Sequence, residues 1–85
     1  MPEICCFYGI IIFMNYNEHD PPHFHARYEE QEVTIEIKSG IVKGQMSKRG
    51  LRMLFEWSEI YHEELMENWR FARERKPLEK ILPLP

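Results

Sequence analysis

The chain has no long apolar run and no excess of positive charge. Its longest apolar stretch, residues 10–14, is far shorter than the roughly 20 residues of a membrane-spanning helix, so we predict a core strand there. The N-terminus lacks a basic segment before that stretch and a small-residue cleavage site after it, so we expect no secretory signal. The net charge is −3, from 11 basic and 14 acidic residues, which argues against non-specific binding to duplex nucleic acid. The net charge does not exclude a basic binding site on one part of the surface.

Cysteine is also scarce. The two cysteines, Cys5 and Cys6, are adjacent, and neighbours on a strand point to opposite faces, so they are poorly placed to form a disulfide that staples the fold. We interpret them as structural thiols in a reducing compartment and predict a cytoplasmic location. A chain of 85 residues predicts a single domain with a thin core, because it buries only about 60% of its unfolded surface.

The first half of the chain has the alternation of β-strands. We expect strands at residues 4–7, 10–16, 23–29, 32–38 and 41–43, connected as an antiparallel meander of four or five strands. Residues 10–16 are apolar on both faces, which predicts a central strand covered on both sides. Residues 32–38 alternate strictly, which fixes the register and places the His23, His25 and Arg27 row on the face of Thr34, Glu36 and Lys38.

The second half is helical in pattern. Ser47 is a plausible N-cap, and Pro77 ends the helical region. One apolar stripe recurs at spacings of three and four: Leu51, Leu54, Ser58, Tyr61, Leu65, Trp69 and Ala72. The pattern leaves open two helices that meet near residues 62–63 or one long bent helix. We therefore predict an α+β fold in which one or two C-terminal helices pack on one face of the sheet, followed by an extended tail.

Residues 19–27 carry the densest chemistry, since three of the four histidines fall there. His23, His25 and Arg27 alternate along one strand face, where residues two apart lie about 6.5–7 Å apart. His19 and Asp20 precede them in a loop stiffened by Pro21 and Pro22. This row is the predicted functional site.

Two functional interpretations fit this row. In the first, His23 and His25 act as acid and base on RNA, Arg27 stabilises developing charge, and Lys38 or Lys43 contacts phosphate. In the second, His23 and His25, together with His19 or Asp20, bind zinc, nickel or iron without catalysis. An exposed strand face also favours polar residues that have no function, so a purely structural role is the third interpretation.

Two features of the helical region concern the binding of RNA or of another protein. Lys48, Arg49 and Arg52 place positive charge at a helix start, where acids are preferred, so an anion or RNA contact and a solvated face are equally open. A second stripe of Met53, Trp57 and Ile60 is more typical of a core, but it leaves open contact with a partner protein or a second copy in a homodimer.

The whole chain resembles a small bacterial family, the domain-of-unknown-function (DUF) family 4160. The resemblance rests on the opening Met-Pro-x-Ile and on the segments Phe7-Tyr8-Gly9-Ile10, Pro21-Pro22-His23-Phe24-His25-x-Arg27-Tyr28, Leu54-x-Glu56-Trp57 and Glu63-Glu64-Leu65-x-Glu67-Asn68-Trp69. It implies a cytoplasmic prokaryotic protein that is often encoded beside another small protein. That arrangement resembles toxin–antitoxin pairs, which suggests an RNA-directed toxin with a small partner protein. The chain departs from the family pattern at Cys5-Cys6, where Ser-Arg is common, and at Gly50, where alanine is common.

Overall fold

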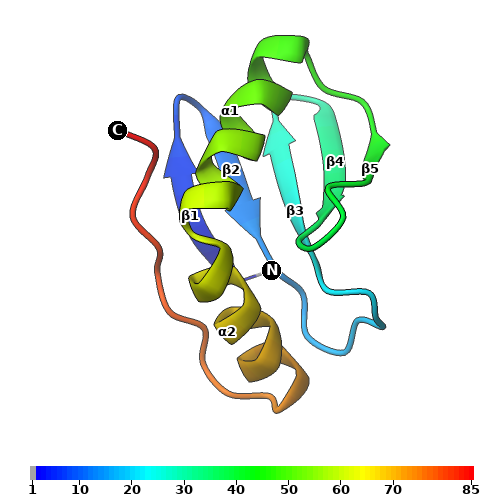
Figure 1. Cartoon of the computed structure of the whole chain (residues 1–85), viewed down its shortest axis with the longest axis vertical. Coiled ribbons are helices and arrows are strands. Elements are labelled where there is room, and N and C mark those ends of the chain that lie inside the picture. The colour runs from blue at the N-terminus through cyan, green and yellow to red at the C-terminus, as the bar shows by residue number, and fades with distance from the viewer. Residues whose placement is uncertain (1) are drawn as a thin grey trace.

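The computed structural model describes residues 2–85, and its sheet is a five-stranded antiparallel meander in the order β1-β2-β3-β4-β5 (Figure 1). The elements are β1 (Glu3–Phe7), β2 (Ile10–Phe13), β3 (His23–Tyr28), β4 (Gln31–Glu36), β5 (Val42–Gly44), α1 (Lys48–Ile60) and α2 (His62–Arg73). The predicted α+β fold is confirmed, and all five strands form, although several end one to three residues away from the expected positions. Neither helix combines the length and apolar character that a bilayer-spanning helix would need.

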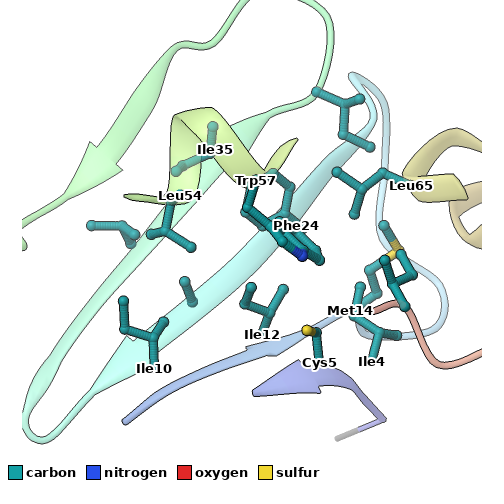
Figure 2. Close-up of a cluster of buried hydrophobic side chains, with 14 of the residues drawn as sticks. Ile4, Cys5, Ile10, Ile12, Met14, Phe24, Ile35, Leu54, Trp57 and Leu65 are labelled. Atoms are coloured by element: carbon teal, nitrogen blue, oxygen red, sulfur yellow. The ribbon is translucent and has the colours of Figure 1, made fainter. Parts of the chain in front are cut away.

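One face of the sheet carries the core. Ile12 of β2, Ala26 of β3 and Val33 of β4 are paired across the strands and are almost completely buried. Trp57 of α1 packs over Phe24 with ring centroids 5.7 Å apart, and both rings lie at the centre of the buried cluster in Figure 2. Burying an aromatic side chain of this size contributes about 1.5–3 kcal/mol, so this contact is a main anchor of α1 on the sheet.

In the described part of the chain, no helix lies over the middle of the opposite face, although Trp69 of α2 contacts His23 at one end of it. Ile11 is only half-buried there, so the expectation that β2 is covered on both sides is wrong. Phe13 is nevertheless 3% exposed on that face, because side chains of β3 shield its ring. This shielding involves the histidine row and is described below.

The helical region consists of two helices rather than one bent helix. Ser47 caps α1 as predicted, since its hydroxyl accepts a 3.1 Å hydrogen bond from the amide of Gly50. Tyr61 separates the helices with φ −107°, and its amide still donates to the Trp57 carbonyl. Of the second apolar stripe, Trp57 is completely buried, whereas Ile60 is 54% exposed.

The C-terminal tail returns along β1. The amide of Ile81 donates to the Ile4 carbonyl at 2.8 Å, and the indole N–H of Trp57 donates to the Leu82 carbonyl at 2.8 Å. Asn68 of α2, which is 1% exposed, holds the tail through two hydrogen bonds to the backbone of Glu79, at 2.8 and 2.9 Å. The tail therefore covers the outer edge of β1 and ties it to both helices.

We expect Asn68→Ala to lower the free energy of unfolding by about 1–3 kcal/mol, because it removes two part-buried hydrogen bonds between the Asn68 side chain and the Glu79 backbone, each worth about 0.5–1.5 kcal/mol. Urea denaturation followed by circular dichroism measures this loss. The control is Glu67→Ala, which removes an exposed neighbour on the same helix. Equal urea midpoints for the two variants would show that the hydrogen bonds between Asn68 and Glu79 add nothing to stability.

Candidate functional site

The alternation of β3 points its histidines away from the core. Phe24 and Ala26 are fully buried under the helices, so His23, His25 and Arg27 emerge on the open face. The register places His23 opposite Glu36 and His25 between Phe13 and Thr34. The predicted row and its cross-strand neighbours Thr34 and Glu36 are confirmed, whereas Lys38, predicted on the same strand face, lies beyond β4, which ends at Glu36.

The loop between β2 and β3 adds a carboxylate to this row. His25 Nε2 lies 2.6 Å from Glu18 Oε1, and His23 Nε2 lies 3.3 Å from the same oxygen. One potential ligand atom from each of the three side chains lies within 4.8 Å of the other two. Glu18, His23 and His25 thus form a compact cluster, called the Glu-His-His cluster below.

A backbone carbonyl orients the ring of His23. Its Nδ1 is 2.8 Å from the Pro21 oxygen, which can only accept, so Nδ1 carries the hydrogen of this bond. A neutral His23 then presents the lone pair of Nε2 to Glu18 Oε1 at 3.3 Å. Two acceptors at that separation repel one another, so the arrangement calls for a proton or a cation between them.

His25 is fixed by stacking. Its ring lies on Phe13 with centroids 4.9 Å apart and an interplanar angle of 14°, and the residue is 8% exposed. The guanidinium of Arg27 also lies 5.8 Å from the centroid of the Phe13 ring. Among the described residues, His25 Nδ1 is a buried side-chain atom without a hydrogen-bond partner, and its nearest acid, Glu32, is 3.8 Å away. The packing thus permits Nε2, and not Nδ1, to interact with Glu18.

The cluster keeps its carboxylate ionised. Partial burial raises the pKa of Glu18, but hydrogen bonds and electrostatic interactions with His25 and His23 lower it by more, so the net pKa is below the ordinary value. Trp69 of α2 lies against His23 with ring centroids 5.0 Å apart and covers one side of the His23 ring. An anion is therefore held beside two imidazoles in a partly shielded position.

The other predicted site residues lie around this cluster. Asp20 forms a 3.0 Å ion pair with Arg73 of α2, whose hydrogen bond lowers the pKa of Asp20. His19 lines a pocket of about 170 Å³, whose other lining residues are Asp20, Pro21, His23, Thr34, Glu36, Ile41 and Lys43. Sequence reasoning missed Glu18, although a carboxylate at the start of the proline-stiffened loop was a signal that could have identified it.

Cysteine plays no part in the cluster. Cys5 faces the core, where burial raises the pKa of its thiol, and the Cys6 side chain is exposed. The candidate ligands are therefore two imidazole nitrogens and one carboxylate oxygen, a set suited to zinc, iron or nickel. Two ligands about 2.1 Å from a tetrahedral ion lie about 3.4 Å apart, which the His23–Glu18 distance of 3.3 Å already matches. The 2.6 Å contact of His25 is a hydrogen bond that a bound ion would replace.

Comparison with known proteins identifies the family of this chain. Residues 9–70, well over half of the chain, match the family described as a domain of unknown function, DUF4160. Searches of curated proteins and of solved structures found no match. The matched range contains the complete Glu-His-His cluster and both helices except the end of α2. The chain belongs to the DUF4160 family.

Proposed function

We propose that the protein binds a divalent transition-metal ion through Glu18 and the Nε2 atoms of His23 and His25. The observation that carries this proposal is the orientation of His23. Its Nδ1–H is committed to the Pro21 carbonyl, so in the neutral imidazole the lone pair of Nε2 faces the Glu18 carboxylate. A backbone carbonyl on the far nitrogen is the usual partner of a metal-ligating histidine, because it fixes the tautomer and orients the ring.

Burial supports an ion over a larger reactant in contact with both histidines. The side chain of His25 is 11% exposed and that of Glu18 is 27% exposed. Little of the His25 side chain is therefore available for contact with the scissile phosphate of an RNA. An ion needs only the volume between the three ligand atoms. With three protein ligands it would keep at least one open position, as catalytic rather than structural zinc sites do.

We expect wild-type protein to take up one equivalent of Zn²⁺ and His25→Ala to bind it at least about tenfold more weakly. Loss of a second-shell partner alone typically costs about 10–100-fold in affinity, so loss of a ligand should cost no less. Affinity should fall as the pH is lowered, because metal ligands must be deprotonated to bind the ion. Isothermal titration of metal-stripped protein measures all three quantities.

The matched control is His62→Ala, which removes the exposed histidine at the start of α2. Circular dichroism of each variant establishes that the fold is intact. The metal proposal fails if wild type takes up no stoichiometric zinc, or if His62→Ala weakens binding as much as His25→Ala does.

A second candidate is RNA cleavage by a toxin-like protein of a two-protein pair, with His23, His25 and Arg27 as the catalytic residues. It is favoured by the pocket of about 170 Å³, where His19, His23 and Lys43 bring two imidazoles and a cation together, although His25 and Arg27 do not line this pocket. Such groups can supply a base, an acid and charge stabilisation without a metal. The inferred partner protein would then act as the antitoxin.

We expect, under this second proposal, that purified protein cleaves single-stranded RNA in the presence of EDTA. His23→Ala should lower the rate by about 10²–10⁴-fold, which is the usual contribution of a general acid or base. Expression of the His23→Ala/His25→Ala variant should spare cell growth that wild type arrests, whereas His62→Ala should arrest it fully. Harmless wild-type protein, or an equally toxic double variant, would exclude the RNA role.

A further inference from the structure

A second pocket lies at the opposite end of β3 from the Glu-His-His cluster. It has a volume of about 330 Å³, and its lining residues are Tyr8, Ile10, Tyr28, Met46, Ser47, Arg49, Gly50 and Met53. The β1–β2 turn, the β3–β4 turn and the first turn of α1 meet at this end of the sheet (Figure 1). Since His23 and Tyr28 are separated by about 17 Å of strand, this pocket is independent of the proposed metal site.

Two tyrosines form the walls. Tyr8 is 61% exposed and has φ +49°, a conformation that is rare for a bulky residue and costs about 1–2 kcal/mol. Tyr28 lies across the same turn, since a Cβ on Gly9 would be 3.0 Å from its ring. The turn therefore holds one aromatic ring out toward solvent beside another, and the packing of the Tyr28 ring depends on the glycine.

The floor is apolar and adaptable. Ile10 is buried beneath it, and Met46 and Met53 supply flexible thioethers that adjust to a bound shape. Gly50 makes room for Met46, because a Cβ there would lie 2.9 Å from the Met46 Sδ and Cγ atoms. An added methyl group would thus displace the Met46 side chain that forms the floor.

The charge at this pocket opposes that of the whole chain. Among the described residues, Arg49 is the one basic residue that lines it and none of the lining residues is acidic, whereas the net charge of the protein is −3. A guanidinium pairs with carboxylate or phosphate through two parallel hydrogen bonds and also stacks on aromatic rings. The volume lies within the range of small-molecule pockets, about 300–1,000 Å³.

We propose that this pocket binds a small molecule that combines a planar aromatic ring with one anionic group. The ring packs against Tyr8, Tyr28 and the methionine floor, and the anion pairs with Arg49. Both a nucleoside monophosphate and an aromatic carboxylic acid have this chemistry. The proposal does not depend on the metal site.

The test uses two matched pairs of compounds in ¹H–¹⁵N NMR titrations of the full chain: AMP against adenosine, and indole-3-acetate against indole. We expect saturable shifts at pocket amides, with the anionic member of at least one pair binding about tenfold or more tightly than its neutral counterpart. Whichever pair shows the difference identifies phosphate or carboxylate as the preferred anion.

Three variants make the result specific. Arg49→Gln should abolish the preference for the anion, whereas Arg52→Gln, a matched change outside the lining, should keep it. Gly50→Ala should weaken binding of the aromatic ring through the displaced Met46. The proposal is overturned if no compound saturates at concentrations of about 1 mM or below, or if Arg49→Gln and Arg52→Gln behave alike.

Discussion

Phe24 is buried against Trp57 with ring centroids 5.7 Å apart, and this contact decides which way β3 faces. Side chains on a strand alternate with a period of two, so a slip of one residue would bring His23 and His25 into the core. Burying two imidazoles among Ile12, Trp57 and Leu65 would cost several kcal/mol without partners. Burial of the apolar side chains of β3 thus fixes the direction in which its histidines point.

The loop between β2 and β3 is held from outside the sheet. The hydroxyl of Tyr16 donates to the Lys76 carbonyl, and Asp20 pairs with Arg73. The amide of Ile37 donates to the Pro22 carbonyl at 3.0 Å. Through these contacts α2, the tail and the segment after β4 limit where the loop can lie, and the loop in turn places Glu18 beside the two histidines. Asn68 contributes at a distance, because it fastens the tail to α2.

The two candidate sites use the two ends of one strand in different ways. The Glu-His-His cluster is partly buried, rigidly stacked and anionic at its centre, which suits a small cation. The pocket beside Tyr8 is open, aromatic and cationic, which suits a larger ligand of the opposite charge. A small domain can carry both because the core lies between the sheet and the two helices, and the two sites use side chains at opposite ends of the sheet.

Local rules were sufficient for much of this protein. Alternation predicted the strands and put His23, His25 and Arg27 on one face, and the Ser47 cap and Pro77 bounded the helical region. Resemblance of the motif segments identified the family. These inferences succeed because hydrophobic period, capping and proline geometry act over a few residues.

Only the tertiary structure decided the composition of the cluster and the second pocket. The sequence offered Asp20 and His19 as the nearest partners of the histidine row, yet Asp20 pairs with Arg73, more than fifty positions away. Glu18 reaches the row because a loop folds back, and no periodic pattern encodes the path of a loop. The pocket likewise joins two turns to a helix start that are remote in sequence. These contacts depend on how distant segments pack together, and a single sequence does not reveal that packing.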